Sequence, residues 1–280
     1  MLKHPSYICI LLLSITLPLL LGCQTTQSAS PSPQVKKPTT YAPKHQDPIP
    51  LLVYHHFCET EAGVVSGATR TIANFKIDMQ YLHQQGYTAV SYQDVMNHYD
   101  NNSPLPPKPY VMRFDDGYLS NYTLAFPVMQ QYNAKATICV IGVHVGKSKN
   151  VIPRFTWAQA REMIDSGLIS IQSHTYDLHK ADPLGVTRLE NESLADYKTR
   201  LKNDFTKVNT LIEQNLGYKP YLLAFPNRVC NPAAQQVAED SGYTFTTARL
   251  ETIPQQTSNQ KYNLKRYSIF SNSKLSDLLK

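Results

Sequence analysis

Short apolar runs alternate with helix-like segments along most of this chain, and this alternation is the feature that most constrains its fold. Between the runs, apolar residues recur at helical spacing or follow helix-start signals. Seven runs are typical of buried strands: 49–54, 88–90, 110–114, 136–143, 168–172, 221–225 and 243–247. Repeated strand and helix units favour an α/β fold, with a parallel sheet that is covered by helices and is either open or closed into a barrel.

Three of the predicted helices have clear signals. The first contains Phe75, Met79 and Leu82 at positions i, i+4 and i+7. The second begins at Thr156, which a Gln follows three residues later in a capping box. The third is a long, polar-faced helix over residues 194–216.

Polar residues follow four of the predicted strands. The four clusters are His55-His56, Asp115-Asp116-Gly117, Ser173-His174 and Pro226-Asn227. Because the carboxyl ends of parallel strands open on one face of the sheet, residues far apart in the sequence are expected to meet there. The sequence therefore predicts an active site built from strand ends.

The stretch SHTYDLH contains two histidines five residues apart, His174 and His179. Five residues on a helix rotate about 140° beyond a full turn, so the pair cannot share a helical face. We expect them on a strand end and its curling loop, where Thr175 and Asp177 would shape the loop. Two His and one Asp supply three ligands for a divalent cation such as Zn²⁺ and leave a position for water.

Asp115 and Asp116 are adjacent, which argues against a glycosidase. Glycosidase carboxylates flank the scissile bond, about 5 Å apart in retaining enzymes and about 6.5–9.5 Å apart in inverting ones. Neighbouring residues diverge from one backbone point and do not straddle a sugar easily. Two different roles fit adjacent carboxylates better, with one Asp binding a metal and the other acting as a general base.

These motifs resemble those of the polysaccharide deacetylase family, also called carbohydrate esterase family 4 or the NodB-homology domain. The resemblance is carried by FDDG at 114–117 and by the SHT…H run. With an upstream YHH and RFDDGY in this order, the chain resembles the branch that N-deacetylates poly-β-1,6-N-acetylglucosamine, a biofilm exopolysaccharide. The resemblance implies a single distorted (β/α) barrel with fewer than eight repeats.

The resemblance also implies roles for individual residues. Asp116, His174 and His179 would hold a divalent metal ion, with Zn²⁺ expected and Ni²⁺, Co²⁺ or Fe²⁺ as alternatives. Asp115 would be the general base. The motif order is permuted in this branch, so His55 is the candidate general acid, with His56 as a structural neighbour.

Two later segments depart from the family pattern or match it loosely. The third motif commonly has an aromatic-Pro-Tyr-Gly turn, and residues 225–230 read FPNRVC instead. Asn227 is the candidate substrate-binding residue of this turn. Arg266 matches a late motif in which an Arg orients the catalytic Asp, or it is a surface residue.

The N-terminus predicts a lipid-anchored envelope protein. Residues 1–22 are expected to be a lipoprotein signal peptide, and Cys23, at the end of an apolar run, is expected to be lipidated. Residues 23–47 form a polar, Pro-rich flexible spacer before a catalytic domain at 48–280. The anchor would hold the protein at the outer membrane, facing the periplasm, in a Gram-negative cell, or at the outer face of the cell membrane in a Gram-positive one.

The net charge and the cysteines limit which partners and disulfides the chain is expected to have. The formal net charge is +6, but no nucleic-acid-binding motif accompanies it. The expected partners are a β-linked N-acetylglucosamine polymer, the membrane and exopolysaccharide export machinery. Cys139 is expected to be buried, whereas Cys58 and Cys230 could pair in an oxidising compartment.

The leading interpretation is a metal-dependent poly-β-1,6-N-acetylglucosamine N-deacetylase of the biofilm matrix. Two alternatives stay open. One is a deacetylase of peptidoglycan or chitin-like oligosaccharides, which differs only in substrate. The other is an inactive saccharide-binding lipoprotein.

Overall fold

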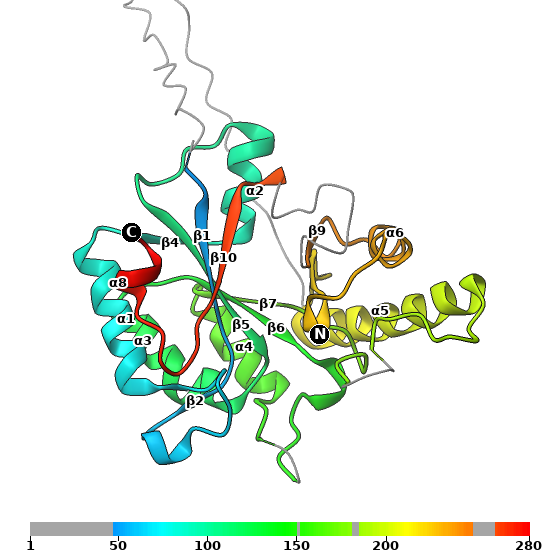
Figure 1. The fold of residues 1–280 in the computed structure, drawn as a ribbon, viewed down its shortest axis with the longest axis horizontal. Helices are drawn as coiled ribbons and strands as arrows, with labels where there is room; N and C mark the ends of the chain where they lie inside the picture. Colours follow the sequence, from blue (N-terminus) through cyan, green and yellow to red (C-terminus); the bar gives the residue numbers. More distant parts are fainter. Residues whose placement is uncertain (1–46, 150–151, 181–184, 249–260) are drawn as a thin grey trace, which may run out of the picture. The chain divides into compact units, whose positions relative to one another are not determined.

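The computed structural model describes residues 47–149, 152–180, 185–248 and 261–280 (Figure 1). The predicted signal peptide, Cys23 and almost all of the predicted spacer lie outside these residues. In the described part of the chain, no helix has the length and apolar character needed to cross a membrane.

The described residues form one main sheet of eight strands, all paired in parallel. The order is β10-β1-β5-β6-β7-β8-β9, with β4 also paired to β5. The strands are β1 Ile49–Tyr54, β4 Thr88–Val90, β5 Pro109–Asp116, β6 Ala136–Val140, β7 Ile169–Ser173, β8 Leu222–Ala224, β9 Phe245–Thr247 and β10 Leu264–Ser268. Within the described ranges, β9 and β10 are the two ends of this order and do not pair with each other, and β4 pairs with β5 alone. The predicted α/β fold is therefore confirmed as a curled half-barrel that is open between β9 and β10.

Helices cover the sheet and connect its strands (Figure 1). They are α1 Ile72–Gln84, α2 Tyr92–Asn101, α3 Phe126–Gln131, α4 Trp157–Asp165, α5 Leu194–Leu216, α6 Pro232–Asp240 and α8 Leu275–Leu278. Short turns of helix lie at η1 Glu61–Gly63, η2 Asn121–Ala125, η3 Gly142–His144 and η4 Pro226–Arg228, and β2 Phe57–Cys58 pairs with β3 Arg70–Thr71. The predicted capping box at Thr156 is present, and α5 has the bounds predicted for it.

A cluster of four buried aromatic residues packs α1 against β1 and β5. The cluster consists of Tyr54, Phe57, Phe75 and Phe114, with ring centroids 4.8–6.0 Å apart. Most of the pairs are edge-to-face or tilted, which is the arrangement that aromatic quadrupoles favour. The cluster lies beneath the ends of β1 and β5, where the polar residues of the sequence begin.

The predicted strand at 136–143 is longer than the observed β6. The run at 136–143 was expected to be a single strand, but β6 ends at Val140 and η3 begins at Gly142. The Gly142 backbone N–H donates to the carbonyl of Thr175, 2.9 Å away, so the chain leaves the sheet to contact the loop after β7.

The predicted pairing of Cys58 with Cys230 is wrong, because all three described cysteines are free and buried. The Cys58 thiol donates to the carbonyl of Thr60 at 3.2 Å, and the Cys230 thiol to that of Asn231 at 3.5 Å. Cys58 belongs to β2, whereas Cys230 packs in a separate hydrophobic cluster beneath α5 and α6. The prediction that Cys139 is buried is confirmed.

Candidate functional site

Asp115 and Asp116 are the last two residues of β5, and both are buried. Successive side chains of a strand point to opposite sides, so the two carboxylates diverge. Asp116 also has a left-handed backbone, with φ of 74°. Non-Gly residues adopt this conformation rarely, and where they do the surrounding structure holds them there.

Asp116, His174 and His179 come together as the sequence predicts. The Oδ1 atom of Asp116 lies 3.5 Å from Nε2 of His174 and 3.4 Å from Nε2 of His179. One potential ligand atom from each residue lies within 4.8 Å of the others. This Oδ1 atom is buried and has no hydrogen-bond partner in the described residues, so its lone pairs fit the role of a metal ligand.

His174 is neutral and is oriented with one ring nitrogen toward Asp116. Its Nδ1–H donates to the carbonyl of Ala224 at 2.6 Å, so Nε2 faces Asp116. Burial lowers the pKa of His174 to about 4, even though nearby carboxylates oppose the shift. A neutral imidazole whose other nitrogen is hydrogen-bonded to a carbonyl is the usual form of a metal-binding His. The donor set therefore fits a divalent cation such as Zn²⁺.

His179 reaches the group because the chain turns sharply after β7. Thr175 is fully buried with φ of 70°, an outlier for a β-branched residue. The rings of His174 and His179 end 4.8 Å apart between centroids, at an interplanar angle of 63°. This is the strand end with a curling loop that the five-residue spacing predicts.

Asp115 is held by Arg113, which sequence reasoning missed. Nη2 of Arg113 donates to Oδ2 of Asp115 at 2.9 Å, and Nε lies 2.8 Å from Oδ1. Nη1 donates to the hydroxyl of Thr247 at 2.6 Å, so β9 also holds this guanidinium. A signal was present in the sequence: Arg113 interrupts an apolar strand two residues before Asp115 and so shares its side of the strand.

The charge around Asp115 keeps it ionised. Burial is the largest single influence and opposes ionisation, but the charge of Arg113 together with those of its other neighbours outweighs burial and lowers the pKa of Asp115 far below its ordinary value. Nη2 of Arg266 lies 4.0 Å from Oδ2 of Asp115, and the Arg266 side chain is 17% exposed. Burial, followed by the charge of Arg113, lowers the pKa of Arg266 to about 10. Arg266 therefore faces Asp115 and is not a surface residue.

His55 and His56 point to different surroundings. Nε2 of His55 lies 3.9 Å from Oδ2 of Asp115, and the backbone carbonyl of His55 accepts a hydrogen bond from Nδ2 of Asn121 at 2.8 Å. Nδ1 of His56 instead lies 3.0 Å from the hydroxyl of Ser120. Burial, and then the charge of Arg154, lower the pKa of His56. Only His55 is placed beside the candidate base.

The end of β8 contributes a backbone group to the site. Asn227 is exposed in η4 with φ of 51°, and its role in substrate binding stays a prediction. Ala224, three residues earlier, supplies the carbonyl that orients His174.

Comparison with known proteins identifies the family of this fold and site. The family model described as polysaccharide deacetylase matches residues 102–246, just over half of the chain. The chain is 26% identical over 223 residues to the poly-β-1,6-N-acetyl-D-glucosamine N-deacetylase of Escherichia coli (strain K12). That match covers 67% of this chain but 33% of the relative, so the chain spans about a third of the relative's length.

Two solved structures have the same fold over most of the chain. A de-N-acetylase from Aggregatibacter actinomycetemcomitans matches with a TM-score of 0.70 and 27% identity, covering 83% of this chain and 99% of that one. IcaB from Ammonifex degensii matches in fold with a TM-score of 0.67 and 24% identity, covering 82% and 94% of the two chains. From the family model, the half-barrel and the motifs at its strand ends, this chain belongs to the polysaccharide deacetylase family.

Proposed function

We propose that the protein is a metal-dependent N-deacetylase of poly-β-1,6-N-acetyl-D-glucosamine, acting in formation of the biofilm matrix. The observation that carries the proposal is that a candidate metal site and a candidate acid–base pair lie side by side at the end of β5. Asp116 points to two imidazoles, and Asp115 points to Arg113 and His55. The E. coli relative, a poly-β-1,6-N-acetyl-D-glucosamine N-deacetylase, supports the choice of reaction and of polymer.

Asp116, His174 and His179 would hold the cation, with Zn²⁺ as the first choice and Ni²⁺, Co²⁺ or Fe²⁺ as alternatives. The chemistry that such a cation supplies when bound is polarisation of a carbonyl and a lower pKa for coordinated water. The buried Asp116 and the neutral His174 would keep their donor atoms aimed at this position without rearrangement.

Asp115 and His55 would move the protons of the reaction. Asp115, ionised because of Arg113, accepts a proton from the attacking water as the new C–O bond forms at the acetamide carbon. His55 donates a proton to the sugar nitrogen as the C–N bond breaks, so acetate and a glucosamine residue leave. The 3.9 Å between Nε2 of His55 and Oδ2 of Asp115 supports the assignment of acid and base to one reacting centre.

We further propose that Cys23 carries a lipid and tethers the enzyme in the cell envelope, where the polymer and its export machinery would be its partners. A Cys23→Ala variant should lose label from a radioactive fatty acid and leave the membrane fraction. Label retained at full strength would exclude lipidation at this residue.

The test of function is acetate release from β-1,6-linked and β-1,4-linked N-acetylglucosamine oligomers, measured in parallel with protein stripped of metal and reloaded with Zn²⁺. Release from the β-1,6 oligomer alone, lost in His179→Ala, is expected. Release from the β-1,4 oligomer alone would keep the chemistry but move the substrate to peptidoglycan or chitin. No release from either, with no Zn²⁺ retained, would favour a saccharide-binding lipoprotein.

A further inference from the structure

The loop that carries His179 is attached to α5 by one buried carboxylate, that of Asp204. The backbone N–H of Tyr176 donates to Oδ1 of Asp204 at 2.7 Å, and the N–H of Asp177 donates to Oδ2 at 2.8 Å. Asp204 is 8% exposed and lies in the middle of the 23-residue helix. Each of its oxygens therefore accepts a hydrogen bond from the loop that joins the two candidate metal ligands.

The opposite side of this loop is held by the backbone of η3. The carbonyl of Thr175 accepts a hydrogen bond from Gly142, and that of Tyr176 accepts one from Val143, each at 2.9 Å. A Cβ atom on Gly142 would lie 3.0 Å from the Tyr176 ring, closer than ordinary van der Waals contact. The disfavoured φ of Thr175 is thus held between η3 on one side and Asp204 on the other.

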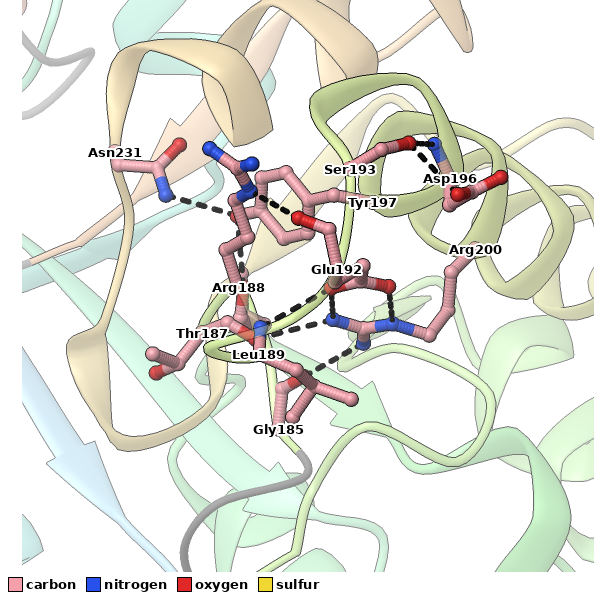
Figure 2. A network of polar contacts seen from close by, with 11 residues as sticks. Gly185, Thr187, Arg188, Leu189, Glu192, Ser193, Asp196, Tyr197, Arg200 and Asn231 are labelled. Carbon is pink, nitrogen blue, oxygen red and sulfur yellow. Dashed lines mark hydrogen bonds and ion pairs between the residues drawn. The ribbon is translucent and has the colours of Figure 1, made fainter.

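The same helix also holds the chain after His179. Arg200, one turn before Asp204, forms two hydrogen bonds with the carboxylate of Glu192, at 2.7 and 2.9 Å. It also donates to the carbonyls of Gly185 and Thr187, each at 3.0 Å (Figure 2). The described residues on both sides of His179 are therefore attached to α5.

The ionised form of the Asp204 carboxylate is unfavourable at this buried position. Burial raises its pKa to about 6, although the N–H groups of Tyr176 and Asp177 lower it. A buried group whose ionisation opposes folding adds little to stability at neutral pH. Its two hydrogen bonds act instead on the position of the loop.

We propose that Asp204 is a positioning residue for the metal site, whose two hydrogen bonds to the His174–His179 loop set the direction from which His179 meets Asp116. The proposal rests on the proposed function, because it needs that group to bind a cation. It differs from the roles of Asp116, His174 and His179, since Asp204 would touch neither cation nor substrate.

The experiment measures metal binding separately from activity. The Zn²⁺ dissociation constant of Asp204→Asn is compared with that of the unsubstituted protein by competition with a chromophoric chelator. The visible spectrum of the Co²⁺-loaded forms reports ligand geometry. The matched control is Glu213→Gln, an exposed carboxylate on the same helix that lies 3.9 Å from Lys219.

Asp204→Asn keeps one acceptor and turns an amide N–H₂ toward the second N–H. We expect Zn²⁺ affinity to fall by roughly 10- to 100-fold, as for other residues that orient metal ligands. We also expect a changed Co²⁺ spectrum. The melting temperature of the metal-free protein should stay within about 4 °C, the effect of roughly 1 kcal/mol in a chain of this size. Glu213→Gln should change neither affinity nor spectrum.

Unchanged affinity and spectrum in Asp204→Asn would overturn the proposal and leave the proposed function standing. A loss of affinity matched by a large fall in melting temperature would also overturn it, by showing a structural role. If the unsubstituted protein binds no Zn²⁺, the proposed function fails first. Should the amide variant not fold, Asp204→Glu replaces it, and affinity equal to the unsubstituted protein's would contradict the proposal.

Discussion

At the scale of residues, two buried carboxylates besides Asp116 support the site, and each is held by different contacts. Asp115 is held by charge, through Arg113, and its pKa is lowered. Asp204 is held by two backbone N–H groups in a buried place, and its pKa is raised. Loss of the negative charge should therefore destabilise the folded protein at Asp115, where ionisation favours folding, and stabilise it at Asp204, where ionisation opposes folding.

Arg113→Met should leave Asp115 buried and unpaired. Removing one partner of a buried ion pair costs about 3–5 kcal/mol, so the free energy of unfolding should fall by roughly this amount. The activity should fall steeply as well. Both are measured on purified protein, by urea denaturation and by acetate release, with Arg161→Met on α4 as the control.

The double variant Arg113→Met/Asp115→Asn tests the cause of that loss. Because the second substitution removes the unpaired charge, stability should recover relative to Arg113→Met alone while activity does not. A double variant less stable than either single variant would contradict the unpaired-charge explanation.

The raised pKa of Asp204 predicts a pH-dependent difference in stability. The native pKa of about 6 exceeds the ordinary value of 3.8, so folding takes up a proton between these values. This contribution to stability is complete below about pH 3.8 and is lost as the pH rises through about 6. Besides the two N–H groups, Asp177 faces Asp204 and raises its pKa, and Lys207 lowers it.

The measurement is urea denaturation of metal-free protein and of Asp204→Asn from pH 5 to pH 7.5. The unsubstituted protein should lose stability relative to the variant by roughly 1.4 kcal/mol over this range, because about one pH unit of it lies below the native pKa of about 6. A constant difference between the two proteins across the range would show that Asp204 does not titrate as the structure indicates.

At the scale of elements, strand ends supply the site and helices fix its loops. β5 provides both Asp115 and Asp116, β7 continues into His174, and β1 continues into His55. α5 holds the loop after β7 through Asp204. The aromatic cluster beneath β1 and β5 fixes how α1 packs on these strands.

Phe75→Ala should test how much this packing contributes. Phe75 is fully buried against Tyr54, Phe57 and Phe114. Truncating a buried Phe typically costs about 3–5 kcal/mol, through lost transfer free energy and the cavity left behind. Ile77→Ala on the same helix is the control, because Ile77 is 61% exposed and should cost less than about 1 kcal/mol. Equal losses for the two variants would argue against the packing of α1 described above.

At the scale of the whole molecule, metal binding and folding should be linked. A ligand that binds only the native state stabilises it by about 2.7 kcal/mol at a concentration of 100 times its dissociation constant. Zn²⁺ should therefore raise the melting temperature of the protein, and a chelator should reverse the change. His179→Ala should abolish most of this increase, and an equal increase in that variant would exclude His179 as a ligand.

Much of the fold and part of the site were predictable from local sequence patterns. The strand runs, the capping box at Thr156 and the bounds of α5 follow from periodicity and helix-start signals, which depend on near neighbours. That an Asp after β5 would meet His174 and His179 was predictable because parallel strands open on one face. The choice of Asp116 over Asp115 came from the resemblance to the deacetylase family, whereas the other conclusions need only the element type and the direction of the strands.

Other features depend on contacts between distant parts of the chain, and the sequence alone did not determine them. Whether Cys58 and Cys230 meet is decided by the packing of β2 and α6 on different parts of the sheet. The link from Asp204 to Tyr176 joins residues 28 positions apart, and that from Arg113 to Thr247 joins residues 134 apart. The sequence by itself determined the element types, the strand ends and the ligand chemistry, because these follow from local periodicity and residue type. The tertiary structure decided which buried charge holds which loop, because a buried polar group finds its partner only when the packed elements bring one within hydrogen-bond distance.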